Sequence, residues 1–274
     1  MTIKETRMRF ALDIETTLDR VGDGLYSRPL TDVFWNMDSA FGGWAIALAL
    51  EAVSLETDAP RALASINAIF VSAIRGDTVF VRVERLRQSK RTGFYRAELR
   101  QDAPDGPLLF STDIVISDRP ETDLAYQPAM PEVESPDETE RLAFPPGMGP
   151  RWFGHFDQRI VIGAPFTVQE RPHSAVWIRD GDGRPLDGKG LAAISDVPMP
   201  RAFFLADTPR FSSTVSYSYF QFATEEELAA IGNDHILVES DSNRIRRGMS
   251  DQHARIWSQD GALLALTSQM AFFR

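Results

Sequence analysis

The chain has 274 residues, with 29 Lys or Arg against 39 Asp or Glu, so its formal net charge is −10. A surface this acidic disfavours non-specific attraction to nucleic acids and to anionic membranes, and neither is expected as a partner. Cysteine is absent, which excludes disulfides, thiolate nucleophiles and cysteine-bound metals within this sequence. Because no apolar stretch approaches about 18 residues and the first residues lack a secretory h-region, we expect a cytoplasmic protein that does not insert into membranes.

Residues 118–150 differ in composition from the rest of the chain. They contain seven of the 17 prolines, with acidic residues between them. Proline fixes φ and donates no backbone hydrogen bond, so this stretch is incompatible with the interior of a sheet or a long helix. We therefore predict an extended linker at 118–150 that separates an N-terminal unit, 1–117, from a C-terminal unit, 151–274.

The two units share a pattern of turns. Asp105-Gly106 and Asp260-Gly261 each stand between alternating apolar segments, as in β-hairpins, and they lie 155 positions apart. Gly93 and Gly248 are separated by the same 155 positions. A basic pair precedes each of these two glycines: Lys90 and Arg91 in the first unit, Arg246 and Arg247 in the second. The agreement of several features at one offset indicates an internal duplication.

Each unit is predicted to contain one buried helix followed by strands. Residues 41–53 are apolar nearly all round, with Asp38 or Ser39 available as N-cap, so we expect this helix to be buried on every side. A shorter helix is predicted at 190–196, ended by Pro198. A helix wrapped by an antiparallel sheet is the hotdog architecture, and the fold class is therefore α+β, a double hotdog. The predicted strands are 63–73, 78–87, 93–101 and 107–117, then 212–222, 235–242, 251–258 and 262–273.

Several motifs for other chemistries are incomplete. The segment 183–190 matches the phosphate-binding loop motif GxxxxGK[ST] except at its last position, where Gly190 replaces the required Ser or Thr. The four histidines are scattered without ligand spacing, and no GxSxG nucleophile motif occurs. We expect no metal site and no cofactor.

Two polar residues stand out because their surroundings are apolar. Asp196 follows the second predicted helix in AAISDVPMP, and Gln269 interrupts a strand that is otherwise apolar, where the first unit has Ile114. A buried carboxylate must find partners or bind a proton. Thr214, on the strand 212–222, could join them. The structural alternative is that Asp196 caps a helix and Gln269 lies at the edge of a sheet.

These residues lie in segments that resemble the acyl-CoA thioesterase II (TesB-like) family across both units. Residues 41–43 (FGG) resemble the start of the family's first helix, and 172–179 (PHSAVWIR) its PHxxVWIR strand. Residues 192–196 (AAISD) are similar to its YASD segment, and 260–269 to its final DGxLVASxxQ strand. One departure is clear: Ser216-Tyr217 and the residues after them stand where the family usually has an acid–His pair followed by WFHRP.

The resemblance implies hydrolysis of a fatty acyl-CoA to free fatty acid and coenzyme A. The family's site, in which an Asp, a Thr or Ser and a Gln hold the hydrolytic water, maps onto Asp196, Thr214 and Gln269. We expect Asp196 to act as general base and the backbone N–H groups of Gly42 and Gly43 to meet the carbonyl oxygen.

Coenzyme A carries phosphates, so local cations are needed on this acidic chain. The candidates are the two repeated basic pairs, Lys90 with Arg91 and Arg246 with Arg247. Two other functions stay open: a non-catalytic acyl-CoA or lipid-binding double hotdog, and an enoyl-CoA hydratase. The hydratase is disfavoured because no His follows Asp196 until His235. An open sheet edge also predicts a homodimer or a larger homo-oligomer.

Overall fold

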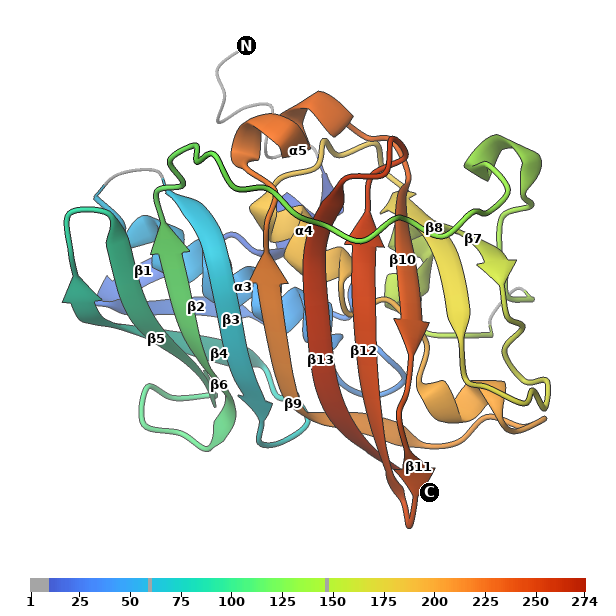
Figure 1. Ribbon diagram of the computed structural model, residues 1–274. Coiled ribbons are helices and arrows are strands. Elements are labelled where there is room, and N and C mark those ends of the chain that lie inside the picture. Colours follow the sequence, from blue (N-terminus) through green and yellow to red (C-terminus); the bar gives the residue numbers. More distant parts are fainter. Residues whose placement is uncertain (1–9, 59–60, 146–147) are drawn as a thin grey trace.

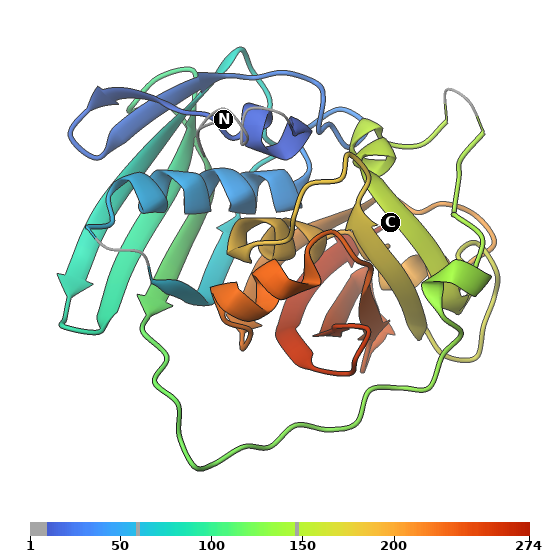
Figure 2. The same cartoon turned by 90° about the horizontal axis from the view of Figure 1, so that it is seen from above.

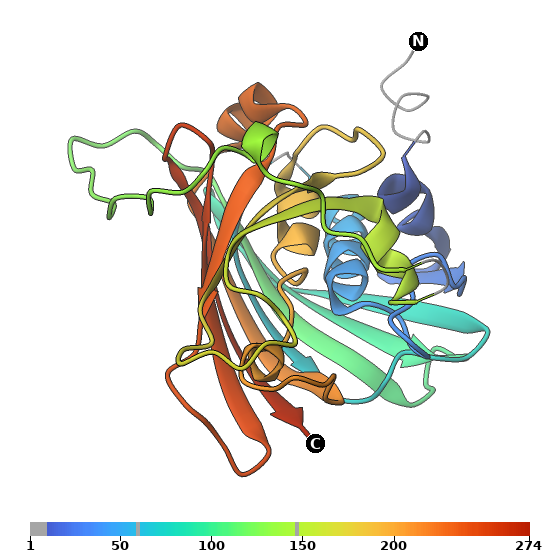
Figure 3. The same ribbon diagram turned by 90° about the vertical axis from the view of Figure 1, so that its right-hand side faces the viewer.

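A computed structural model describes residues 10–58, 61–145 and 148–274. Its main feature is one 13-stranded antiparallel sheet with the order β1-β2-β4-β5-β6-β3-β9-β13-β12-β10-β8-β7, with β11 paired to β12 (Figure 1). The sheet curves around helices α3 and α4, which lie against its concave face (Figure 3). This arrangement confirms the predicted α+β double hotdog.

The first half contains the N-terminal six strands and two helices. Their bounds are α2 (Ala11–Glu15), β1 (Asp19–Gly22), β2 (Leu25–Pro29), α3 (Gly42–Leu55), β3 (Ala62–Phe70), β4 (Thr78–Gln88), β5 (Thr92–Gln101) and β6 (Leu108–Ser117). The second half has β7 (Phe156–Ile162), β8 (Ser174–Asp180), α4 (Gly188–Ile194), β9 (Ser212–Gln221), α5 (Glu225–Ile231), β10 (Ile236–Asp241), β11 (Ile245–Arg246), β12 (Met249–Trp257) and β13 (Leu263–Phe273). Three 3₁₀ turns complete the described structure: η1 (Pro136–Glu138), η2 (Arg151–His155) and η3 (Arg201–Phe204).

The two halves meet where β3 pairs with β9, from Ser65 opposite Phe220 to Ile69 opposite Ser216. Outward from this joint the strand orders are β3-β6-β5-β4-β2-β1 and β9-β13-β12-β10-β8-β7. The halves therefore have the same topology, as the repeated turns predict. Because β3 and β9 run antiparallel, equivalent features of the two halves lie at opposite ends of the sheet.

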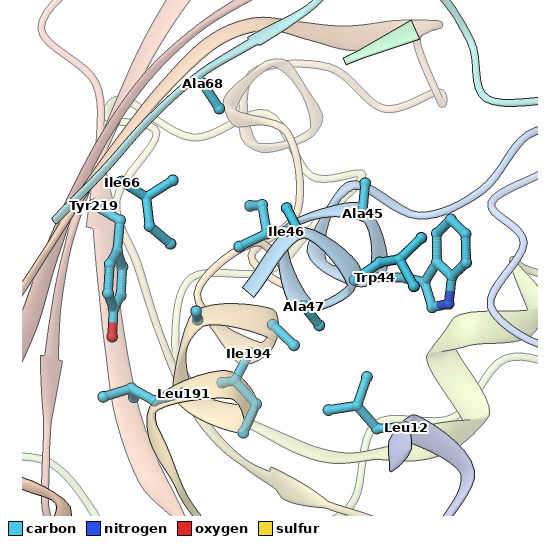
Figure 4. Close-up of a cluster of buried hydrophobic side chains, with 14 of the residues drawn as sticks. Leu12, Trp44, Ala45, Ile46, Ala47, Ile66, Ala68, Leu191, Ile194 and Tyr219 are labelled. Carbon is cyan, nitrogen blue, oxygen red and sulfur yellow. The ribbon is translucent and has the colours of Figure 1, made fainter. Parts of the chain in front are cut away.

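Helix α3 forms the centre of the core, as its composition predicts (Figure 4). Its residues from Gly43 to Ala49 are all buried, and Gly43 comes so close to α4 that a Cβ there would lie 2.5 Å from the Ala193 carbonyl oxygen. The predicted N-cap is wrong. Phe41 occupies that position without a side-chain cap, and the carboxylate of Asp38 is instead bound by Arg75.

Helix α4 is shifted by two residues from its predicted range, because Asp187 caps it by accepting a hydrogen bond from the Gly190 N–H at 2.7 Å. The helix ends at Ile194, which leaves Asp196 in the turn that follows. The larger of two hydrophobic clusters extends through both halves and includes side chains from α3, α4 and both parts of the sheet. The turn carrying Asp196 is thus held inside a shared interior.

Residues 118–135 cross the outer face of the second half, and the described part of 118–150 contains no strand or α-helix (Figures 1 and 2). The Gln127 side chain donates to the Gly261 carbonyl at 2.8 Å and accepts from the Leu263 N–H at 3.0 Å. The Trp177 indole donates to the Glu134 carbonyl at 2.8 Å. The segment thereby covers apolar residues on that face. Within the described ranges, no helix is long and apolar enough to cross a membrane.

Candidate active site

Asp196 lies against the N-terminus of α3, across the boundary between the two halves. A Cβ built on Gly42 would be 2.5 Å from Asp196 Oδ2, so the contact depends on the absence of a side chain there. The backbone N–H of Gly43 donates a hydrogen bond to the Asp196 carboxylate. A helix N-terminus carries unpaired N–H groups and a positive dipole end, which favour an anion at this position.

Burial gives this carboxylate an unusual acidity. The loss of hydration raises the pKa of Asp196 to about 7, and the Gly43 hydrogen bond opposes that rise only in part. A carboxyl group with such a pKa accepts a proton near neutral pH far more readily than an ordinary Asp. It therefore has the acidity expected of a general base.

Thr214 and Gln269 lie together on neighbouring strands β9 and β13. The Thr214 hydroxyl donates to Gln269 Oε1 at 2.8 Å. Their meeting depends on a β-bulge: Ser216 pairs with Met270 but Thr214 pairs with Ala271, which leaves Val215 as the extra residue. Strict alternation from the inward-facing Tyr217 would turn Thr214 outward, and the bulge returns it to the inner face.

Tyr217 connects these two parts of the site. It lies opposite Gln269 in the β9–β13 register, and its hydroxyl is 2.5 Å from Ser195 Oγ, next to Asp196. Burial and the nearby charge of Asp196 raise the pKa of Tyr217 above its ordinary value, so the phenol stays protonated. Ser195 Oγ donates to the Ala192 carbonyl at 2.6 Å, and its single proton is then used. Tyr217 is therefore the donor to Ser195.

The sequence did not single out Tyr217 and Ser195 as part of the site. The available signal was the departure at Ser216-Tyr217, where the resembled family has an acid–His pair. Among the described hydrogen bonds, none joins Asp196 directly to Thr214 or Gln269. The site thus consists of Asp196 with the start of α3, and the Thr214–Gln269 pair, with Tyr217 between them.

The structure also tests the two structural interpretations, a helix cap at Asp196 and an edge amide at Gln269. Asp196 does accept a hydrogen bond at a helix N-terminus, but the helix is α3 of the other half. Gln269 is not at a sheet edge, because β13 lies between β9 and β12. Its side chain is only 8% exposed on an interior strand, so the edge interpretation is wrong.

The two basic pairs lie at opposite ends of the sheet. Arg246 and Arg247 form the β11–β12 hairpin turn, with positive φ at Arg247 and Gly248. Met249 faces Phe272 and Phe272 faces Ser213, which places this turn at the Thr214 end, beside the C-terminus (Figure 1). The exposed pair Lys90 and Arg91 joins β4 to β5 at the end marked by Thr92 and Ser117. The antiparallel joint between the halves causes this separation.

Comparison with protein families decides the assignment. Residues 133–273 match the acyl-CoA thioesterase C-terminal domain, and residues 31–115 match the acyl-CoA thioesterase N-terminal domain. The chain belongs to the acyl-CoA thioesterase family. It is accordingly a thioester hydrolase, and the resemblance based on its sequence motifs is confirmed. No curated protein matches the sequence.

Solved structures support the same fold over nearly the whole chain. A hotdog-fold protein of unknown function from Alicyclobacillus acidocaldarius is 25% identical with a TM-score of 0.90, covering 96% of this chain and 98% of its own. A putative thioesterase II from Thermobifida fusca is 16% identical with a TM-score of 0.82, and the shares covered are 97% and 98%. An acyl-CoA thioesterase II from Mycobacterium marinum is 18% identical with a TM-score of 0.73, and covers 96% and 98%. At these identities the last two comparisons establish the fold.

Proposed function

We propose that this acyl-CoA thioesterase hydrolyses fatty acyl-CoA with a water activated by Asp196. The observation that carries the proposal is the Asp196 carboxylate at the start of α3, with a pKa of about 7. Hydrolysis without a Cys or Ser nucleophile requires a base of this kind and a polarised carbonyl group.

The proposed reaction begins with a water held by Thr214 and Gln269. As the water oxygen bonds to the thioester carbon, its proton passes to the Asp196 carboxylate. The carbonyl oxygen gains negative charge, which N–H groups in the first turn of α3 around Gly42 and Gly43 stabilise. Collapse of the tetrahedral intermediate breaks the C–S bond, and the thiolate of coenzyme A takes the proton from Asp196. The products are the carboxylic acid and free thiol.

The position of Gly43 refines this proposal. Its N–H donates to Asp196 in the absence of substrate, so we assign it first to orienting the base. We assign Gly42 to the substrate, because a glycine has no side chain to keep the thioester carbonyl away from the helix start beside Asp196. For the coenzyme A phosphates, Arg246 and Arg247 are the favoured candidates because they lie at the Thr214 end of the sheet.

The direct test is thiol release from a panel of short-, medium- and long-chain acyl-CoAs, followed with a chromogenic disulfide. The protein has no cysteine and adds no background. We expect release by the wild type and a loss of at least about 10² in kcat for Asp196→Asn, the lower range for general-base catalysis. Wild-type turnover in that variant would contradict the assignment of the base. Saturable acyl-CoA binding without release would identify the non-catalytic alternative.

A further inference from the structure

A row of polar side chains extends from Gln269 across the concave face of the second half. Gln252 on β12 lies directly opposite Gln269 on β13. Ser240 on β10 pairs with Ala254, two residues from Gln252, and also pairs with Ser174 on β8. All four polar residues are at most 8% exposed. In the first half, the residue aligned with Gln269 is Ile114, and Tyr95 stands opposite it. The polar row is thus a property of the half that carries Asp196.

A buried arginine sits within this row. Arg201, in η3, is 1% exposed and donates to Gln252 Oε1 at 3.0 Å and Ser174 Oγ at 2.8 Å. Its other acceptors are backbone carbonyls, those of Pro172, Met199 and Ser240. Within the part of the chain that the structure describes, no carboxylate lies in ion-pair distance of this guanidinium. A buried cation held only by neutral acceptors is costly and needs a reason.

Arg201 fixes the direction of the Gln252 amide. Because Oε1 accepts from the guanidinium, the NH₂ end must point away from Arg201. Gln252 Nε2 is buried and has no hydrogen-bond partner, and the same holds for Ser240 Oγ. Buried donors without acceptors are rare in native proteins, so a ligand atom is a natural partner for this amide.

A narrow crevice lies between the segment that follows Asp196 and the strands at the Ser174 end of the polar row. On the side of that segment it is lined by Pro198 and Met199, which follow Asp196 closely, and by Phe204, whose ring stacks under Arg201 with 4.4 Å between guanidinium carbon and ring centre. On the side of the sheet its wall includes Ser174, which Arg201 holds. The remaining lining is apolar except for Gln158, as expected for a path taken mainly by an acyl chain.

We propose that Gln252, oriented by Arg201, donates a hydrogen bond to an oxygen carried by the acyl chain of the substrate. The enzyme then selects acyl groups with an oxygen acceptor a few carbons from the thioester over plain hydrocarbon chains. The short distance follows from the pairing of Gln252 with Gln269, because opposed residues of neighbouring strands lie about 5 Å apart. This inference rests on the proposed hydrolysis at Asp196 and names its substrate class.

The experiment compares kcat/KM for matched acyl-CoAs that differ by one polar group. 3-Hydroxybutanoyl-CoA is paired with butanoyl-CoA, and glutaryl-CoA with pentanoyl-CoA, which separates a hydroxyl from a carboxylate acceptor. We expect the wild type to prefer at least one oxygenated substrate by about tenfold or more, as for a hydrogen bond in a site built to make it. Equal kcat/KM within both pairs would overturn the proposal.

Two variants test the residue itself. Gln252→Met keeps the length of the side chain and removes the donor. The ratio of kcat/KM between the oxygenated and the plain substrate should therefore fall close to one. Gln221→Met is the matched control, since Gln221 on β9 is also a buried amide but lies outside both the polar row and the lining of the crevice. Its preference should equal that of the wild type. A preference retained by Gln252→Met would overturn the assignment. If that variant does not fold, Gln252→Glu pairs with Arg201 and should reject glutaryl-CoA.

A binding measurement tests this inference independently of the proposed hydrolysis. Thioether analogues of the same four acyl-CoAs cannot be hydrolysed, and calorimetry gives their affinities for the wild type. Tighter binding of an oxygenated analogue, lost in Gln252→Met, supports the inference even if no thiol is released from any thioester. Equal affinities together with rapid release would leave the hydrolysis standing and the inference refuted.

Discussion

Oδ2 of Asp196 lies 2.5 Å from the point where a Cβ on Gly42 would be. The carboxylate comes from the turn after α4 in the second half, and the glycine begins α3 in the first half. Neither half therefore contains the whole site, although each has the complete hotdog topology. The two halves contribute differently to the candidate site: the second supplies the proposed base, and the first supplies the helix N-terminus against which it lies.

Substitution of Gly42 tests this relationship. A methyl group in Gly42→Ala would displace the Asp196 carboxylate and also press on the Phe70 ring, 3.2 Å away, so we expect a fall in kcat of about tenfold or more with the fold retained. Gly43→Ala is the comparison, because its methyl group would meet the backbone carbonyl of Ala193 at 2.5 Å. We expect that variant to lose thermal stability. Kinetics and thermal unfolding of both variants check the contrast, and an unchanged kcat in Gly42→Ala would refute it.

The activity should depend on pH through Asp196. Its pKa is about 7, and only the carboxylate accepts a proton from water, so kcat/KM should fall on acidification with an apparent pKa near 7. An ordinary Asp would keep its activity down to about pH 4. A pH profile of thiol release, read at each pH after neutralisation, measures this. A flat profile from pH 5 to 8 would show that Asp196 is not the base.

The same pKa shift has a consequence for stability. Because the pKa of Asp196 is raised in the folded state from its ordinary 3.8, the native protein holds the proton more tightly than the unfolded chain. Ionisation therefore lowers the free energy of unfolding as pH rises from about 4 to 7, and the loss persists above pH 7. At 1.36 kcal/mol per pKa unit it amounts to at most about 4 kcal/mol. Asp196→Asn should unfold at a higher temperature than the wild type at pH 8, with a smaller gain at pH 4. An equal or lower melting temperature at pH 8 would contradict this.

The sequence predicted the main elements of this fold because their patterns are local. The eight predicted strands all occur with small shifts of their ends, and the apolar composition of α3 correctly indicated burial on every side. The strands β1, β2, β7 and β11 and the helices α2 and α5 were not predicted. The N-cap prediction was wrong because the helix begins only at Gly42, which puts Phe41, and not Asp38 or Ser39, in the cap position.

The sequence indicated which residues belong to the candidate site but not how they contact one another. Asp196 and Gln269 stood out as polar residues in apolar segments, but their contacts depend on tertiary structure. The meeting of Thr214 with Gln269 requires a bulge at Val215 that no alternation pattern shows. The role of Arg201 was also hidden, because an arginine after Pro200 in sequence gives no sign that it will be buried.

The Thr214 hydroxyl gives a further test of the site. Thr214→Val keeps the shape of the side chain but removes the donor to Gln269 Oε1, so Gln269 loses one of the contacts that orient it. We expect kcat to fall by about tenfold, the value of one neutral hydrogen bond, with melting temperature nearly unchanged. Thr214→Ser retains the hydroxyl and should recover most of the activity. Equal activity of the Val and Ser variants would exclude a role for the hydroxyl.

The two basic turns provide an internal comparison for coenzyme A binding. They occupy equivalent positions in the two halves, yet only the turn of Arg246 and Arg247 lies at the sheet end that carries Thr214. Replacement of both arginines by Ala should raise KM for acyl-CoA severalfold with little change in kcat, because exposed cations attract the phosphates without touching the reacting atoms. The effect should weaken at high salt, since screening acts on exposed charges. The matched variant, with Lys90 and Arg91 replaced by Ala, removes the same charge at the other end and should leave KM unchanged. An equal rise in KM for both pairs would mean that the net charge of the chain, and not the position of the turn, governs substrate capture.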